Sequence, residues 1–144
     1  MYYHFKVHRE DGFWAECIEI DGCASQSEDG TYESLIKNLS EALNLTLDEP
    51  DENIIFPLPM KDSDENEDDL IKIKVDPNIA LSLYFKHLRR KSGLTQKEVA
   101  EKLGYKSVWA YQKLERGKYS NLQLKTLGKI KQVFPELDLN LIFS

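Results

Sequence analysis

The stretch GLTQKEVAEKLG at residues 93–104 contains the signals for a short helix and for the turns on both sides of it. Thr95 and Glu98 have the spacing of a capping box, which starts a helix immediately after Thr95. Gly93 is placed to end the helix before it, and Gly104 supplies a left-handed turn that ends the new helix and redirects the chain. The stretch therefore predicts one member of a tightly connected pair of helices.

A partner helix is predicted just downstream, over residues 108–116. Tyr111 and Leu114 in this segment are spaced to meet the apolar residues Val99 and Leu103 of the first helix. These four side chains would fill the angle between the two helices, which fixes how the pair packs.

The rest of the C-terminal half is predicted to be mostly helical. Asp76 and Pro77 form a fitting N-cap and first turn, and amphipathic segments follow at residues 80–91 and 122–134. Alternating residues predict a strand at residues 70–75. Residues 137–143 alternate again and could form a strand that covers the helices or pairs with a second copy. We therefore expect a helical domain over residues 70–144.

Residues 79–134 resemble the helix-turn-helix domain of phage repressors of the Cro/CI type (XRE) and of their bacterial relatives, because turn, cap and core positions match together. The resemblance implies that Gln96 contacts a phosphate or a base edge, and that the following helix enters the major groove. It further implies that four residues face the groove, namely Val108, Trp109, Gln112 and Lys113. Three residues would lie near the backbone phosphates, namely Lys106, Ser107 and Lys118. Arg89 and Glu115 would form a structural ion pair.

Several features of this motif allow more than one interpretation. The segment between Gly104 and Gly117 is one residue longer than the commonest pattern of the family, so the second helix can start at either of two positions. Trp109 would belong to the core if buried, and would contact a thymine methyl group or a sugar if exposed. The helices could also serve packing or protein binding alone. DNA binding is favoured because the basic surplus coincides with the motif.

Charge is divided unequally along the chain, whose 144 residues have a net charge of −6. Residues 1–69 contain 4 Lys and Arg against 19 Asp and Glu, whereas residues 70–144 contain 15 against 6. The acidic, polar stretch 61–69 is predicted to be a linker, with a long surface loop as the alternative. A basic half suits nucleic acid and an acidic half suits a basic protein, so the sequence predicts two domains, residues 1–60 and 70–144.

The N-terminal half is predicted to be a small antiparallel sheet covered by one long helix. Apolar and polar residues alternate in its first strand, a turn follows at residues 11–12, and a partner strand resumes after it. Thr31 is placed to cap the helix. With the C-terminal helices, this makes an α+β chain. The expected strands are residues 2–8, 13–18 and 23–25, and residues 54–56 could add a fourth.

Residues 2–59 resemble the HicB antitoxin family, on the string GFWAECIEIDGC at residues 12–23 and the Glu-Ala-Leu at residues 41–43. The resemblance implies a degenerate ribonuclease H-like fold and a type II antitoxin. Its acidic domain would cover a small basic HicA ribonuclease that cleaves mRNA, and its C-terminal domain would repress the shared operon. Toxin contacts are expected on acidic and aromatic residues, each of which could instead be ordinary solvated surface. They are Glu10, Asp11, Trp14, Glu16, Glu28 and Asp29.

Two other functions fit the same sequence. A free-standing repressor would use its N-terminal domain to sense a small ligand, and an adaptor would have no role on DNA. A neighbouring gene for a small, Lys-rich, His-containing protein would favour the antitoxin. Because operators for this fold are palindromic, we expect a homodimer, with residues 137–143 as a candidate interface.

Enzymes, metal sites, cofactors and membrane spans are not expected. The sequence has no phosphate loop or Ser-His-Asp arrangement, and its carboxylates near turns do not fall on matching strand positions for two-metal chemistry. Cys17 and Cys23 are expected in the core, and His4 and His8 on the surface. No apolar run approaches the roughly 20 residues of a bilayer span, and the chain begins without a leader, so we expect a cytoplasmic protein.

Overall fold

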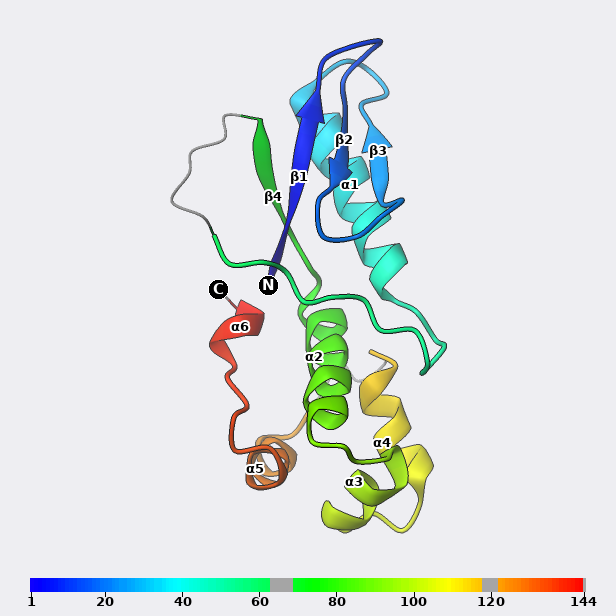
Figure 1. Cartoon of the computed structure of the whole chain (residues 1–144), viewed down its shortest axis with the longest axis vertical. Helices are drawn as coiled ribbons and strands as arrows, with labels where there is room; N and C mark the ends of the chain where they lie inside the picture. The colour runs from blue at the N-terminus through cyan, green and yellow to red at the C-terminus, as the bar shows by residue number, and fades with distance from the viewer. Residues whose placement is uncertain (63–68, 118–121, 144) are drawn as a thin grey trace. The chain divides into compact units, whose positions relative to one another are not determined.

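A computed structural model describes residues 1–62, 69–117 and 122–143 of the chain, which forms two compact units (Figure 1). The N-terminal unit comprises Met1–Asp48 and Phe56–Asp76, and the C-terminal unit comprises Glu49–Ile55 and Pro77–Ser144. The short segment Glu49–Ile55 is therefore bounded on both sides by residues of the other unit.

The N-terminal unit is a four-stranded antiparallel sheet in the order β3–β2–β1–β4, with helix α1 along one face (Figure 1). The predicted hairpin is present, with Phe5 opposite Cys17 and Val7 opposite Ala15. Asp11 and Gly12 in its turn have positive φ angles, a conformation that Asp tolerates and Gly favours. The elements are β1 (Tyr2–His8), β2 (Trp14–Cys17), β3 (Ala24–Gln26), β4 (Leu70–Lys74) and α1 (Tyr32–Leu47).

The core of this unit lies between the sheet and α1. Tyr3 and Phe5 alternate along β1 and are fully buried, and the leucines of α1 that recur every fourth residue, from Leu35 to Leu43, are fully buried as well. The predicted cap is confirmed, because the Thr31 hydroxyl accepts a hydrogen bond from the Ser34 amide at 3.2 Å. The helix is thus held by its apolar stripe and by a cap encoded in the adjacent residues.

β4 lies in the N-terminal sheet, whereas the sequence predicts the strand at residues 70–75 as part of the C-terminal domain. It pairs antiparallel with β1, with Ile73 opposite Tyr3 and Ile71 opposite Phe5. β2 occupies only one edge of β1, so the other edge needs a partner for its backbone groups. The boundary between the units consequently falls after Asp76.

The predicted linker at residues 61–69 falls mostly outside the described residues, and its described ends, residues 61–62 and 69, belong to the N-terminal unit. Asp62 accepts a hydrogen bond from Lys72 Nζ at 2.5 Å, and it lies 3.0 Å from His4 Nε2. Residues 63–68 lie outside the described residues. Residues 54–56, which could have formed a strand, have no regular secondary structure.

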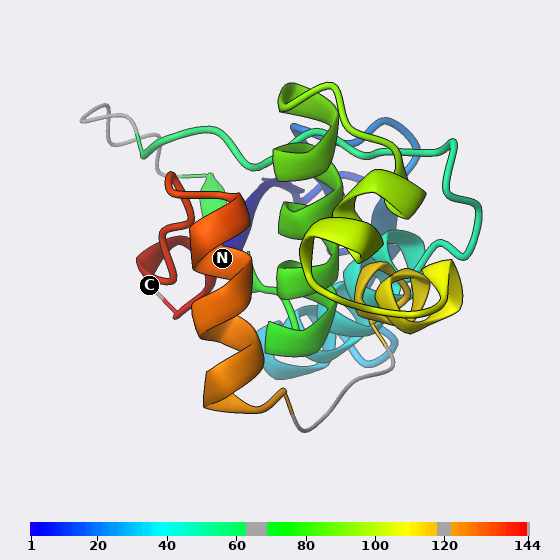
Figure 2. The ribbon, with the colours of Figure 1, turned by 90° about the horizontal axis from the view of Figure 1, so that it is seen from below.

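The C-terminal unit is built around α2 (Pro77–Lys91). Seen from below in Figure 2, α5 lies on one side of α2, and α3 and α4 lie on the other. Phe85 of α2, Tyr111 of α4 and Phe134 after α5 are buried at the centre. The remaining helices are α3 (Gln96–Lys102), α4 (Val108–Glu115), α5 (Leu124–Val133) and α6 (Asn140–Phe143).

The prediction that residues 137–143 could form a strand is wrong, because residues 140–143 form the short helix α6. Asp138 starts this turn through its side chain, which accepts a hydrogen bond from the Asn140 amide at 2.9 Å. Leu137 and Ile142 are buried, five residues apart, while Leu141 and Phe143 stay exposed. Burial of these two residues and the local cap outweigh the strand-like alternation.

Candidate nucleic-acid interface

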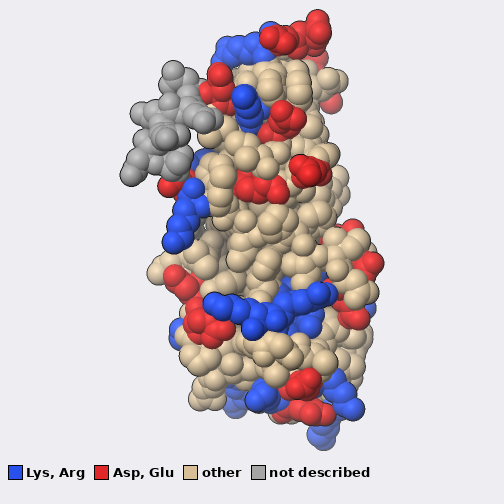
Figure 3. Space-filling view, in the orientation of Figure 1, with Lys and Arg blue, Asp and Glu red and all other residues tan. Residues whose placement is uncertain are grey.

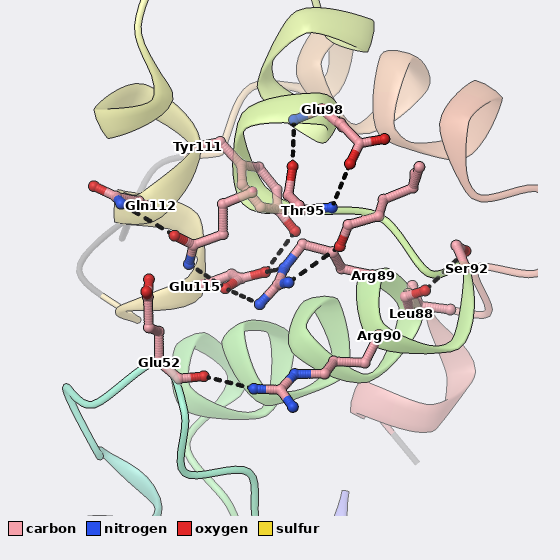
Figure 4. Close-up of polar contacts among 12 residues, drawn as sticks. Glu52, Leu88, Arg89, Arg90, Ser92, Thr95, Glu98, Tyr111, Gln112 and Glu115 are labelled. Atoms are coloured by element: carbon pink, nitrogen blue, oxygen red, sulfur yellow. Dashed lines mark hydrogen bonds and ion pairs between the residues drawn. The ribbon is translucent and has the colours of Figure 1, made fainter.

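The predicted capping box at the start of α3 is present. The Thr95 hydroxyl accepts from the Glu98 amide at 3.1 Å, and the Glu98 carboxylate accepts from the Thr95 amide at 3.3 Å (Figure 4). Gly93, at φ 70°, turns the chain out of α2, and Gly104, at φ 80°, turns it out of α3. Both are conformations that residues with a Cβ atom rarely adopt, so these turns set the angle between α3 and its neighbours.

A buried ion pair between Arg89 of α2 and Glu115 of α4 connects the motif to the rest of the unit (Figure 4). Arg89 Nε donates to Glu115 Oε1 at 2.5 Å, and Nη2 donates to Oε2 at 3.2 Å. The Tyr111 hydroxyl also donates to Glu115, at 2.8 Å. Desolvation disfavours the charged guanidinium, but the hydrogen bonds from Arg89 to Glu115 outweigh it and raise the pKa of Arg89.

Gln96 and Gln112 are joined to the same network. Gln96 Nε2 donates to Glu115 Oε2 at 2.7 Å, and Gln112 Nε2 donates to Gln96 Oε1 at 3.0 Å. Both side chains are half-buried. Two of the expected DNA contacts are therefore linked to each other and, through Glu115, to the core.

The structure places the start of α4 at Val108, which resolves the position that the sequence leaves open. Ser107 is the N-cap, and its hydroxyl accepts a hydrogen bond from the Trp109 amide at 3.2 Å. Ser107 therefore has a structural role that sequence reasoning missed, although a serine directly before a helix is a common cap. Lys106 is exposed beside it.

Trp109 is 55% exposed and does not belong to the core. The ammonium group of Lys113 lies 3.4 Å from the centroid of its ring, one helical turn further along, in a cation–π arrangement. Val108 and Gln112 share this side of α4, whereas Tyr111, Leu114 and Glu115 are buried. Lys118 lies outside the described residues.

Two basic residues beside this surface were missed from the sequence. Arg116, at the C-terminus of α4, lines a hollow together with Gln96 and Gln112, and exposed Lys97 lines another with Gln96. Arg116 follows Gln112 by four residues, which could have indicated a shared helix face. On the visible face of the helical unit in Figure 3, Lys and Arg side chains lie among Asp and Glu side chains.

Residues 85–141 match a family model described as helix-turn-helix. The C-terminal unit contains a helix-turn-helix. Its two helices are α3 and α4, with the turn at residues 103–107 between them. A comparison with curated proteins gave no match. Within the described residues, no helix is both long and apolar enough to cross a membrane.

The expected toxin contacts lie at one end of the N-terminal sheet and in the loop before α1. Trp14 of β2 stacks on His8 at a centroid distance of 4.2 Å, and Glu16 lies 3.0 Å from His8 Nε2. Glu10, Asp11 and Glu28 are exposed. Asp29 is exposed too, but its carboxylate accepts hydrogen bonds from the Thr31 hydroxyl and amide, which lower its pKa and brace the loop.

His4 is buried, whereas the sequence predicts it at the surface. Its Nδ1 lies 2.8 Å from Glu19, and its Nε2 lies 3.0 Å from Asp62. Glu19 also accepts from the Met60 amide at 3.3 Å, so the chain after α1 covers this side of β1. Desolvation opposes a charged imidazole, but the two carboxylates outweigh it and raise the pKa of His4. Across the described ranges, no three His, Cys, Asp or Glu residues gather as metal ligands.

Proposed function

We propose that this protein is a transcriptional repressor that reads operator DNA with α4 of its helix-turn-helix. The observation that carries the proposal is the division of α4 into two faces. Tyr111 and Leu114 are buried, while Trp109 is 55% exposed with Lys113 over its ring. A recognition helix needs both properties, because one face anchors the helix and the other meets the bases.

Each residue on the outer face of α4 suits a specific contact. The amide of Gln112 can form two hydrogen bonds to adenine, Lys113 can bind guanine, and Trp109 and Val108 can pack on thymine methyl groups. Lys106, before the helix, and Lys118, after it, would bind phosphates, which position the helix without reading sequence. Ser107 would support them from the helix N-terminus.

The test is a DNA-binding titration with duplexes that the wild-type chain selects from a random-sequence pool. We expect Lys113→Ala and Gln112→Ala each to lose about 1–3 kcal/mol of specific binding, which is roughly five- to 150-fold in affinity. Lys125→Ala, an exposed lysine on α5, is the matched control and should bind like wild type. If both α4 variants also bind like wild type, α4 is not the recognition helix.

We also propose an antitoxin role, in which the N-terminal unit neutralises a small basic ribonuclease of the HicA type. Charge supports this role, because Met1–Asp48 and Phe56–Asp76 together contain 6 Lys and Arg against 17 Asp and Glu. An acidic surface around Glu10, Asp11 and Glu16 would associate rapidly with a protein that binds RNA. The protein would act by covering the toxin and would itself catalyse nothing.

Neutralisation is tested by co-expressing the full chain with the ribonuclease encoded beside its gene and measuring growth and RNA cleavage. Glu16→Lys should weaken protection because it places a positive charge against a basic partner. Glu41→Lys, an exposed position on α1, is the control with the same change of charge. Unchanged protection by Glu16→Lys would move the toxin contact elsewhere. The absence of such a neighbouring gene would instead favour a repressor whose N-terminal unit senses a small ligand.

A homodimer is part of the same proposal, because two-fold operators are read by two-fold symmetric proteins. Sedimentation of the free chain and of its complex with a duplex of about 30 base pairs, long enough for two half-sites one turn apart, gives both stoichiometries. One chain per duplex would contradict this part of the proposal.

A further inference from the structure

The segment Glu49–Ile55 is acidic and packs against the helix-turn-helix unit. It contains three carboxylates and no Lys or Arg. Two of its backbone carbonyls are held by basic side chains of α2. Lys86 Nζ donates to the Glu49 carbonyl at 3.2 Å, and Arg90 Nη2 donates to the Glu52 carbonyl at 3.2 Å. The segment is thus fixed to α2 through its main chain. Within the segment, the Glu49 carboxylate accepts from the Asp51 amide and the Asp51 carboxylate accepts from the Asn53 amide, both at 2.9 Å.

Two residues of the segment, Asp51 and Glu52, border the DNA-reading side of the motif. A hollow of about 280 Å³ is lined by Asp51 and Glu52 of the segment and by Gln96, Gln112 and Arg116 of the motif. A second hollow, of about 390 Å³, places Glu52 beside Gln96, Lys97 and Val108. Figure 4 shows the Glu52 side chain extending from its anchor on Arg90 toward α4. The segment therefore shares its surroundings with Gln112 and Val108, to which the DNA proposal assigns base contacts, and with Gln96, which the family resemblance implies as a phosphate or base contact.

Lys86 shows what the segment does to the basic surface of this unit. Its side chain is buried, with its ammonium group on the Glu49 carbonyl, and desolvation by burial lowers its pKa. Pro77–Ser144 contains 13 Lys and Arg against 5 Asp and Glu, and the segment adds three negative charges to that surplus of eight. Covering one lysine and neutralising part of the surplus both weaken the attraction of DNA phosphates.

We propose that Glu49–Ile55 is an internal competitor of DNA: its carboxylates occupy the side of the motif that phosphates would occupy, and the segment moves away when DNA binds. The inference rests on the proposed DNA-binding function. A carboxylate and a phosphate oxygen are both acceptors for amide and guanidinium donors, so the two cannot use the same donors at once. Two side-chain hydrogen bonds to backbone carbonyls, one from buried Lys86 and one from exposed Arg90, form a weak enough attachment to be exchanged for DNA contacts.

Removing one carboxylate tests the competition in the full chain. The probe is a duplex of about 30 base pairs selected by the wild-type protein from a random-sequence pool. Glu52→Gln keeps the shape of the side chain and should tighten binding about three- to tenfold, the effect of one charge near a phosphate in dilute salt. Glu136→Gln, an exposed carboxylate after α5, makes the same change of charge and should alter binding less than about twofold.

A second measurement separates displacement from simple repulsion. Ile54 is exposed and lies in the segment, and both native cysteines are buried, so Ile54→Cys accepts a nitroxide label. The label should change from restricted to mobile motion when the duplex is added to saturation. An unchanged spectrum with DNA bound, or equal binding by Glu52→Gln and Glu136→Gln, overturns the competitor. If no variant and not even the wild type retains a duplex, the DNA-binding function itself fails.

Discussion

The buried ion pair gives the sharpest test of the helical unit, through the substitution Arg89→Met. The arginine donates two hydrogen bonds to Glu115 and a third to the Leu94 carbonyl. Methionine fills a similar volume but donates none of them. The carboxylate of Glu115, which is 1% exposed, would keep only the hydrogen bonds from Tyr111 and Gln96.

Breaking a buried pair from one side costs about 3–5 kcal/mol, because the other charge stays buried without its partner. The two remaining donors to Glu115 place the expected loss near the lower end, about 3 kcal/mol. A unit of about 75 residues has roughly 4–11 kcal/mol of stability at 0.05–0.15 kcal/mol per residue. Arg89→Met should therefore remove between a quarter and three quarters of the stability of this unit.

Tryptophan fluorescence can follow this unit alone, because each unit contains one of the two tryptophans, Trp14 and Trp109. In a Trp14→Phe background, urea unfolding of the C-terminal unit is reported by Trp109. With a slope of about 1.5 kcal/mol per molar urea, the midpoint should fall by about 2 M.

Arg90→Met is the matched control, since Arg90 is the exposed neighbour of Arg89 and makes one hydrogen bond to a carbonyl. It should lose less than about 1 kcal/mol. In the double variant Arg89→Met/Glu115→Leu, the loss should be smaller than the sum of the two single losses. A loss below about 1 kcal/mol for Arg89→Met, or strict additivity, would refute the argument that Arg89 and Glu115 form a desolvated pair.

Three further predictions concern a helix cap, a buried histidine and an exposed tryptophan. Thr95→Ala removes the capping oxygen of α3 and should cost about 1 kcal/mol in the same Trp109 assay. His4 has a raised pKa, so its charged form stabilises the fold. That contribution is complete below its ordinary pKa of 6.5 and is lost as the pH rises through the raised value. Trp109→Ala should change stability by less than about 1 kcal/mol but should weaken specific DNA binding.

Each of these predictions has its own control. Thr126→Ala, inside α5 rather than at its cap, should cost less than Thr95→Ala. Unfolding of the N-terminal unit can be followed by Trp14 fluorescence in a Trp109→Phe background. In His4→Gln, the stability of this unit should no longer depend on pH above pH 6.5. If the dependence persists, another group causes it. For Trp109→Ala, equal DNA binding by variant and wild type would place the tryptophan outside the interface.

The features that could be predicted from the sequence depend on residues close together in the chain. The cap at Thr95, the turn at Gly104 and the apolar stripe of α1 each depend on residues at most a few turns apart, and all three are present. The partner of β4 could not be predicted. Alternation shows that residues 70–75 form a strand, but pairing with β1 joins residues almost 70 positions apart. Burial of His4 depends on Asp62 in the same non-local way.

Contacts between residues far apart in the chain also show that two of the candidate DNA contacts, Gln96 and Gln112, have structural partners. The hydrogen bonds from Gln112 to Gln96 and from Gln96 to Glu115 connect the reading face to the buried ion pair. The two amides are therefore oriented before DNA arrives, which lowers the entropic cost of ordering them on binding. For the same reason Gln96→Ala would weaken the core and the interface together, since it leaves Glu115 with one donor fewer. Lys113→Ala is the cleaner probe of DNA reading, because Lys113 lies over the exposed Trp109 ring on the outer side of α4.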